Sequence, residues 1–210
     1  MTQSLPKISF IIMTFNDAKS LKRCLLSIKK QNYPKEKIEI LIIDNASKDN
    51  TLSVAKSFGA KIIINAKDNM YRSLSLGYHA VSGDFAFQLD QDEEIRDETF
   101  LQKMIKPLID NPNLAGSFTR YYPNNNMSWI TRYISYNPAQ LDPLFEYFSP
   151  PVEKFFIREA DGYFLCDYSS KKIPPYTNML YRTLFLKKSP AWNDRYFGDH
   201  EILLGVLEAG

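Results

Sequence analysis

Residues 38–51 read IEILIIDNASKDNT, which is a strand-length run rich in isoleucine followed at once by polar residues. Runs like 38–43 are typical of strands buried on both faces of a parallel sheet. The polar residues 44–49 favour a turn and a helix cap, and 51–58 predicts a short helix that ends at Gly59. This stretch therefore predicts a strand, a loop and a helix in succession.

The same unit recurs on both sides of this stretch. Residues 8–13 predict a buried strand, and Leu21, Leu25 and Ile28 at helical spacing behind Asp17 predict a helix. Further along, the pattern predicts strands at 60–64, 84–89, 114–119 and 179–186, and helices at 69–82, 97–109 and 199–208. Strands that alternate with helices imply an α/β fold with a mostly parallel central sheet.

The alternation ends near residue 120. Of the chain's 29 aromatic residues, thirteen lie between Tyr121 and Tyr168, mixed with prolines and without a clear period. We expect this segment to form loops and short elements over one face of the sheet. A length of 210 residues is ordinary for one domain, so we expect residues 1–210 to fold as a single α/β unit.

Charge and cysteine content narrow the function classes. The 26 basic and 24 acidic side chains leave a net charge of +2, which gives no reason to expect a nucleic-acid partner. Cys24 and Cys166 show neither metal-ligand nor redox spacing, which suits a reducing compartment. No stretch predicts a signal peptide or a membrane span. We expect a cytoplasmic protein; peripheral contact with the inner face of the cell membrane and a longer parent sequence both stay open.

Polar residues follow three of the predicted strands, at the sheet edge where open α/β folds bind ligands. They are Thr14, Phe15, Asn16 and Asp17 after the first strand, Asp44, Asn45, Ser47 and Asp49 after the second, and Asp90, Gln91 and Asp92 after the fourth. Taken singly, Asp, Asn and Ser after a strand are also ordinary helix caps and turn formers.

Asp90 and Asp92 are harder to explain as caps. Two carboxylates two residues apart repel each other unless water or a cation offsets their charge. Mg²⁺ or Mn²⁺ would suit them, because both ions favour carboxylate oxygens and keep positions for substrate phosphates. The pair therefore predicts a divalent metal site that could hold a diphosphate.

The order and spacing of these motifs resemble the GT-A glycosyltransferases of family 2. The motifs that carry the resemblance are IIMTFN at 11–16, IIDNASKDNT at 42–51, Gly77, Gly83-Asp84 and AFQLDQD at 86–92. The resemblance implies a Rossmann-like three-layer α/β/α fold, with a nucleotide-sugar-binding half at 1–120 and an acceptor and catalytic half at 121–210. It also implies that Asp44 contacts the nucleotide base, Asp90 the ribose and sugar, and Asp92 the metal.

The end of the chain extends this resemblance. Gly198-Asp-His-Glu-Ile resembles the family's E-D-x-D-L motif, so Asp199 matches the catalytic base, which in inverting members removes the acceptor's hydroxyl proton. The chain departs from the family at 74–76, where Leu-Ser-Leu replaces an Arg-Asn pair; Arg72 is out of register but stays a candidate donor contact. Gly198 and Gly205 stand where the family usually has Glu and Arg.

The leading interpretation is a metal-assisted inverting glycosyltransferase that moves a sugar, most simply from a UDP-sugar, to a glycan or lipid-linked acceptor of the cell envelope. A non-catalytic sugar-nucleotide-binding domain is the first alternative. A sugar nucleotidyltransferase is a weaker one, because residues 14–19 contain no glycine for a phosphate loop. A dehydrogenase is disfavoured, since no G-x-G-x-x-G follows a predicted strand.

Overall fold

The computed structural model describes residues 4–66, 70–118, 156–160, 163–166 and 179–188. Its strands are β1 (Ile8–Thr14), β2 (Ile38–Asp44), β3 (Lys61–Ile64), β4 (Phe85–Gln88), β5 (Gly116–Phe118), β6 (Phe156–Ala160), β7 (Tyr163–Cys166) and β8 (Met179–Arg182). Its helices are α1 (Ala18–Lys29), α2 (Thr51–Ser57), α3 (Met70–Ala80), α4 (Phe100–Asp110) and α7 (Thr183–Lys188), with a 3₁₀ turn, η1, at Lys35–Lys37.

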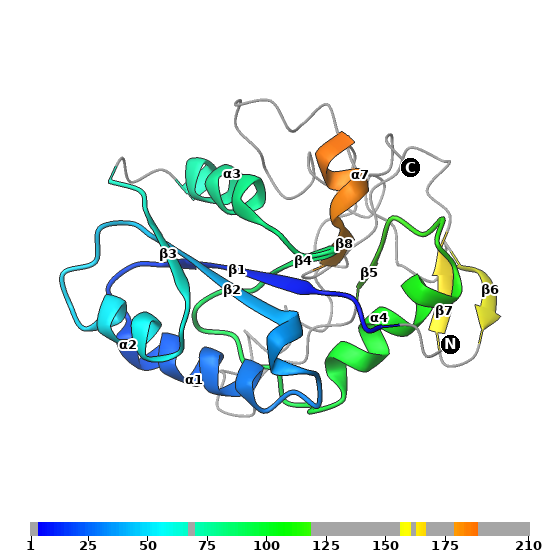
Figure 1. Ribbon diagram of the computed structural model, residues 1–210, viewed down its shortest axis with the longest axis horizontal. Helices are drawn as coiled ribbons and strands as arrows, with labels where there is room; N and C mark the ends of the chain where they lie inside the picture. Colours follow the sequence, from blue (N-terminus) through cyan, green and yellow to red (C-terminus); the bar gives the residue numbers. More distant parts are fainter. Residues whose placement is uncertain (1–3, 67–69, 119–155, 161–162, 167–178, 189–210) are drawn as a thin grey trace, which may run out of the picture. The chain divides into compact units, whose positions relative to one another are not determined.

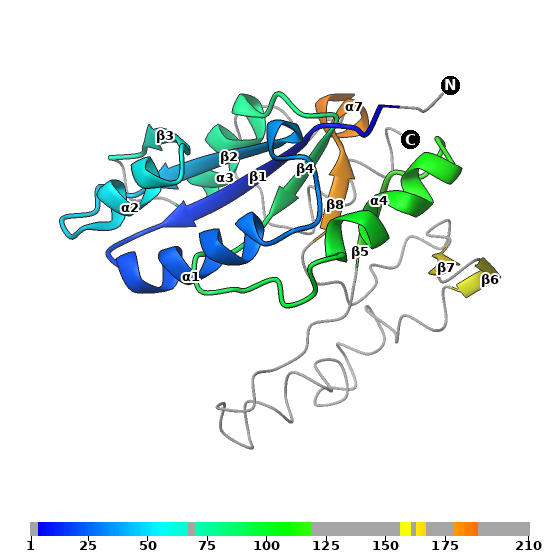
Figure 2. The same cartoon turned by 60° about the horizontal axis from the view of Figure 1, so that its bottom comes forward.

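Six strands form the central sheet in the order β3-β2-β1-β4-β8-β5, and β1 pairs in parallel with both β2 and β4. Strand β8 runs antiparallel to β4. Helices α1, α2 and α4 lie on one face of the sheet and α3 on the other (Figures 1 and 2). The predicted three-layer α/β fold with a mostly parallel sheet is confirmed.

The chain divides into two compact units, residues 1–117 with 180–210, and residues 118–179. Within the second unit, β6 and β7 pair as a separate antiparallel sheet of two strands. The expected division of function at residue 120 stays a prediction.

Both faces of β1 are buried, which explains its apolar composition. Ile8, Phe10 and Ile12 join the core formed with α1 and α4. Ile11 faces α3, where a Cβ added at Gly77 would lie 2.4 Å from the Ile11 Cγ2 atom. The glycine therefore allows α3 to pack closely against the sheet.

The strand predicted at 179–186 is half wrong, because β8 ends at Arg182 and α7 begins at Thr183. The register pairs Arg182 with Phe85, the first residue of β4, and the Thr183 N–H makes one further bond, to the Asp84 carbonyl at 3.0 Å. The apolar residues that follow continue as a helix instead. The helix predicted at 199–208 lies outside the described residues.

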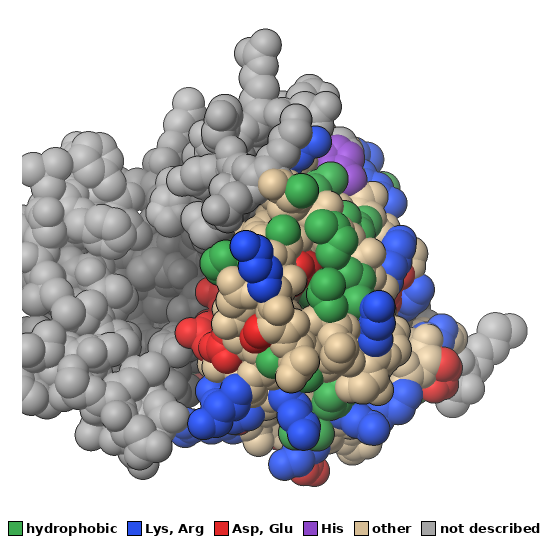
Figure 3. Space-filling model, turned by 90° about the vertical axis from the view of Figure 1, so that its left-hand side faces the viewer, with side chains coloured by type: hydrophobic (Ala, Val, Ile, Leu, Met, Phe, Trp, Pro, Cys, Tyr) green, Lys and Arg blue, Asp and Glu red, His purple; other side chains and the backbone are tan. Residues whose placement is uncertain are grey.

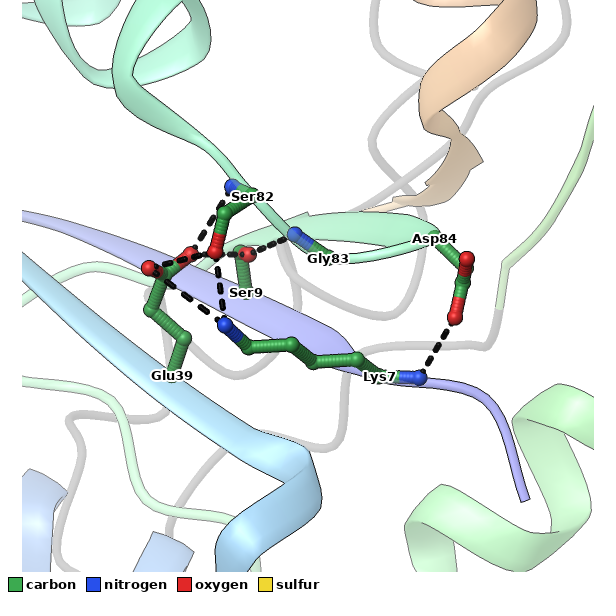
Figure 4. A network of polar contacts seen from close by, with 6 residues as sticks. All are labelled: Lys7, Ser9, Glu39, Ser82, Gly83 and Asp84. Carbon is green, nitrogen blue, oxygen red and sulfur yellow. Dashed lines mark hydrogen bonds and ion pairs between the residues drawn. The ribbon is translucent and has the colours of Figure 1, made fainter. Parts of the chain in front are cut away.

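A network of polar side chains joins β1, β2 and β4 at the amino ends of these strands (Figure 4). The Glu39 carboxylate accepts hydrogen bonds from the Ser9 hydroxyl, from the Ser82 N–H (2.9 Å) and from the Ser82 hydroxyl (2.7 Å). The Lys7 ammonium lies 3.7 Å from the same carboxylate. Three strands that are distant in sequence are thereby held in register at this end.

Gly83 allows this network to close. Its N–H donates to the Ser9 hydroxyl at 2.9 Å, and a Cβ at this position would lie 2.7 Å from the Lys7 carbonyl oxygen and 2.9 Å from the Ser9 nitrogen. Backbone atoms of a central strand cannot easily move aside, so only glycine fits. The Lys7 N–H in turn donates to the Asp84 carboxylate at 2.8 Å.

Glu39 should make the fold sensitive to acid. Burial alone raises the pKa of its carboxyl, but the hydrogen bonds from Ser9 and Ser82 and the Lys7 charge outweigh burial and hold the pKa below its ordinary value of 4.5. A depressed pKa stabilises the fold above the unfolded-state pKa, and this contribution is lost as the pH falls through the folded-state value.

We therefore expect Glu39→Gln to lower the free energy of unfolding near neutral pH by about 1–3 kcal/mol and to flatten its decline between about pH 5 and pH 3. Urea unfolding followed by circular dichroism across that pH range measures both effects. Glu36→Gln, an exposed change on η1, is the control and should leave the curve unchanged. An acid-unfolding slope of Glu39→Gln equal to that of wild type would contradict this assignment.

Candidate functional site

Three loops meet where β1, β2 and β4 end. The first two residues after β1 are Phe15 and Asn16, and the loop between β4 and α4, residues 89–99, is here called the acidic loop. The Phe15 N–H donates to the Gln91 side-chain oxygen at 3.1 Å, and the Gln91 amide returns a 3.5 Å bond to the Phe15 carbonyl. Gln91 therefore joins the loop after β1 to the acidic loop.

The loops after β1 and β2 are joined as directly. The Asn16 N–H donates to the Ser47 hydroxyl at 2.9 Å, and the Lys48 N–H donates to the Asn16 side-chain oxygen at 2.7 Å. Asn16 adopts a φ of 46°, a left-handed conformation that asparagine tolerates better than most residues. The Phe-Asn pair at the end of β1 thus has a clear structural basis.

Asp44 is buried beneath this junction. Its side chain accepts hydrogen bonds from the Thr14 hydroxyl (3.0 Å), the Ser47 N–H (2.8 Å) and the Ser47 hydroxyl (2.6 Å). Asp44 is 0% exposed and Thr14 is 2% exposed. In this structure the Asp44 carboxylate is bonded within the loop, and the expectation that it contacts a nucleotide base stays a prediction.

Asn45 is the more accessible neighbour. Its side-chain oxygen accepts from the Ser73 hydroxyl at 2.6 Å and from the Asn65 amide at 3.3 Å. Asn65 and Ser73 are almost fully buried, and their contacts fix the direction of the Asn45 side chain. The sequence interpretation missed both residues, although Asn65 follows directly after β3 at the same edge of the sheet.

Asp17 and Asp49 act as caps here. Asp17 accepts the Ser20 N–H at 3.0 Å and thereby caps α1. Asp49 accepts N–H groups from Ala18 and Thr51, at the first residues of α1 and α2. Hydrogen bonds from the Thr51 hydroxyl and N–H lower the pKa of the Asp49 carboxyl. Asp17 is confirmed as a helix cap, and the expectation that Asp49 contacts the donor stays a prediction.

The acidic loop presents its carboxylates outward. Asp90 and Asp92 are exposed. Two hydrogen bonds between Asp90 and Glu93 close a tight turn: the Glu93 N–H donates to the Asp90 carbonyl at 3.1 Å, and the Asp90 N–H donates to the Glu93 carboxylate at 3.0 Å. Seen from the end of the sheet where β1 and β2 terminate, acidic side chains gather on one side and basic side chains line the lower rim (Figure 3).

Two further predicted site residues, Arg72 and Asp199, lie outside the three loops. Arg72 is exposed on α3, one residue before Ser73, and Asp199 lies outside the described residues. Within the part of the chain that the structure describes, no three His, Cys, Asp or Glu side chains lie close enough to hold a metal ion by themselves. None of the described helices is long and apolar enough to cross a bilayer.

Comparison with known proteins places the chain in a family. Residues 9–183 match the model of glycosyl transferase family 2. The chain belongs to this family. Glycosyltransferase AglE of Haloferax volcanii is 29% identical over 149 residues, which cover 67% of this chain and 48% of AglE. A dolichyl N-acetyl-alpha-D-glucosaminyl phosphate 3-beta-D-2,3-diacetamido-2,3-dideoxy-beta-D-glucuronosyltransferase of Methanococcus voltae is 35% identical over 120 residues, 52% of this chain and 37% of that protein.

Solved structures of glycosyltransferases share the fold. TarS of Staphylococcus aureus, residues 1–349 in complex with UDP, matches with a TM-score of 0.64 at 20% identity, over 97% of this chain and 54% of that one. PcManGT of Pyrobaculum calidifontis, with GDP-Man and Mn²⁺, matches with a TM-score of 0.59 at 16% identity, over 88% and 47%. The fold is therefore GT-A. The chain spans about half the length of AglE and less of the Methanococcus voltae relative.

The buried position of Asp44 leads to a stability prediction. Asp44→Asn replaces an acceptor-only group by one that also carries two donors, so at least one N–H is left facing the Ser47 or Thr14 donors. We expect the free energy of unfolding to fall by about 1–3 kcal/mol, measured by urea titration. Asp110→Asn, an exposed change on α4, should cost no more than about 0.5 kcal/mol. Equal stability of the two variants would contradict the buried scaffold role.

Proposed function

We propose that this chain binds a nucleoside-diphosphate sugar at the edge formed by the three loops and transfers the sugar with inversion to a glycan or lipid-linked acceptor. The observation that carries the proposal is the direct bonding of the three motifs to one another, Phe15 to Gln91 and Asn16 to Ser47. Membership of glycosyl transferase family 2 supports the reaction class.

The exposed residues of this edge suit the parts of such a donor. Phe15 is 49% exposed and offers an aromatic face on which a nucleobase can stack. Asp44 is proposed to contact the base, and the half-buried Asn45 beside it offers further polar atoms. Asp90 is proposed to bind the ribose and sugar. UDP is the favoured nucleotide because TarS is solved with UDP, while GDP, as in PcManGT with GDP-Man, is the competitor.

The acidic loop fits a divalent cation shared with the donor. Mg²⁺ and Mn²⁺ are commonly held by one or two carboxylates, with substrate phosphates and water completing the shell. Asp92, with Asp90 beside it, meets that requirement, because both carboxylates are exposed at the strand end. A cation bound there would offset the negative charge of the diphosphate leaving group.

Asp199 is proposed as the base that takes the proton of the acceptor hydroxyl. The acceptor class is inferred from the names of the relatives, since one acts on a dolichyl phosphate-linked sugar and another, TarS, is a poly(ribitol-phosphate) beta-N-acetylglucosaminyltransferase. Both names favour an envelope glycan or lipid-linked acceptor. The second candidate is a binding domain without transfer, which gains weight from Gly198 and Gly205 in the altered motif.

Nucleotide binding tests the donor site. In calorimetric titrations with UDP and GDP, with and without Mn²⁺, we expect wild type to bind UDP more tightly when Mn²⁺ is present. Asp92→Ala should lose at least about tenfold of that affinity and with it most of the metal dependence. Glu98→Ala, an exposed change in the same loop, should bind as wild type does. Absence of UDP and GDP binding by wild type under all conditions would overturn the proposal.

Catalysis needs a separate test of Asp199. We expect wild type to hydrolyse a UDP-sugar, with water as the acceptor and UDP as the leaving group. Asp199→Asn should lower that rate at least about a hundredfold, because a general base contributes roughly that much, while UDP affinity stays unchanged. Coupled detection of released UDP measures the rate. Equal rates for the two proteins would remove Asp199 as the base. Binding without any release by wild type would favour the non-catalytic alternative.

A further inference from the structure

Helix α1 contacts the acidic loop through three polar side chains spaced by four residues. Arg23, Ser27 and Gln31, here called the α1 stripe, lie on one side of the helix because neighbours four apart share a face. Gln31 lies just past the helix end, where its N–H still bonds to the Ile28 carbonyl at 3.1 Å. In both ribbon views the acidic loop runs beside α1 on its way from β4 to α4 (Figures 1 and 2).

Ser27 anchors the loop through its backbone. The Ser27 hydroxyl accepts the Ile95 N–H at 3.0 Å and donates to the Cys24 carbonyl at 2.7 Å. Ser27 is 6% exposed, and the Ile95 side chain packs against the hydrophobic core. The Ile95 N–H is thus satisfied by a hydroxyl that is itself fixed to α1.

Gln31 holds the end of the same loop and the start of α4. Its amide donates to the Asp97 carbonyl at 2.9 Å, and its oxygen accepts the Leu101 N–H at 3.2 Å. The N–H groups of a helix's first turn need acceptors from outside the helix, and the N-cap residue Thr99 makes no side-chain cap bond. Because it accepts the Leu101 N–H, the Gln31 side chain caps α4 from outside that helix. Gln31 is 1% exposed, so this bond is shielded from water.

Arg23, the third member of the stripe, forms an ion pair with Glu94 of the acidic loop. The Arg23 Nε atom lies 2.9 Å from the Glu94 carboxylate, and both side chains are about half exposed, so the pair contributes little stability. Burial raises the pKa of the Cys24 thiol, and the negative charges of Glu93, Asp90, Asp92 and Glu94 raise it further. Arg23 joins α1 to Glu94, two residues after Asp92.

We propose that Ser27 and Gln31 are positioning residues that hold the acidic loop so that Asp90 and Asp92 present a preformed metal and diphosphate site. The loop is fixed at its start, where the Leu89 N–H bonds to the Ile11 carbonyl at 3.0 Å, and again from Ile95 onward. Only residues 90–94 lie between these anchors. Like charges in so short a segment repel each other, and the buried anchors keep them together before the cation arrives.

This inference rests on the proposed function, because it concerns the geometry of the same donor site. The variants that test it are Ser27→Ala and Gln31→Met, which remove the hydrogen bonds and keep most of the packing. Ser9→Ala is a matched control, because Ser9 is also a buried serine whose hydroxyl accepts a backbone N–H, that of Gly83, at the opposite end of the strands.

The first measurement is the gain in UDP affinity that Mn²⁺ produces. We expect Ser27→Ala and Gln31→Met to reduce this gain about tenfold, the low end of what loss of outer-shell partners costs at metal sites, without changing metal-free UDP affinity. Ser9→Ala should keep the full gain even if its thermal midpoint falls equally. A gain of wild-type size in both stripe variants would overturn the proposal.

The second measurement does not depend on nucleotide. Hydrogen exchange of peptides from the acidic loop should become about three- to tenfold faster in Ser27→Ala and Gln31→Met, while β2 peptides keep the wild-type rate. Equal acceleration in both regions would show general destabilisation and would overturn the positioning role. If wild type binds neither UDP nor GDP, with or without Mn²⁺, the proposed function is wrong, and exchange rates alone decide whether the stripe fixes the loop.

Discussion

The pairing of β1 with a parallel strand on each side is the constraint on which the rest of the structure depends. The register ends β2 level with β1, at Thr14 and Asp44, and ends β4 opposite Ile11, so the carboxyl ends of all three parallel strands face the same edge of the sheet. Strand order reverses here, since β2 lies on one side of β1 and β4 on the other, and open α/β sheets bind ligands at such a point. Burial of both faces of β1 fixes this edge firmly.

The buried Asp44 carboxylate links the loops after β1 and β2 at this edge. Asp44 has no exposed surface, and a carboxylate taken out of water is stable only when hydrogen bonds replace its hydration. Thr14 and Ser47 supply these bonds, and the Ser47 hydroxyl also accepts a hydrogen bond from the Asn16 N–H. The loops after β1 and β2 therefore adopt one arrangement together, because neither can move without leaving a buried charge unpaired.

The sequence predicted the fold class and most of the strands, whereas the position of the site and the role of each residue stay predictions. Apolar runs predicted β1 and β2 because both faces of those strands are buried, whereas the boundary between β8 and α7 falls inside one largely apolar run, 179–186, and left no local signal. The D-N-x-S motif predicted a polar loop after β2 but not that Asp44 turns inward. Asn65 and Ser73 were missed because their contacts with Asn45 join three separate segments.

The polar and aromatic residues at and near this edge fall into two groups. Buried residues bond to neighbouring segments and fix the loops, and exposed residues face solvent. Asp44, Ser73, Ser27 and Gln31 are buried and bonded to neighbouring segments, whereas Phe15, Asp90 and Asp92 are exposed at the ends of the segments so held. A site in which side chains must meet a flexible, charged donor gains affinity when its geometry exists before binding, because less ordering then opposes association. In the proposed donor site, the internal bonds of the buried polar residues therefore hold the exposed carboxylates in place for a cation and a diphosphate.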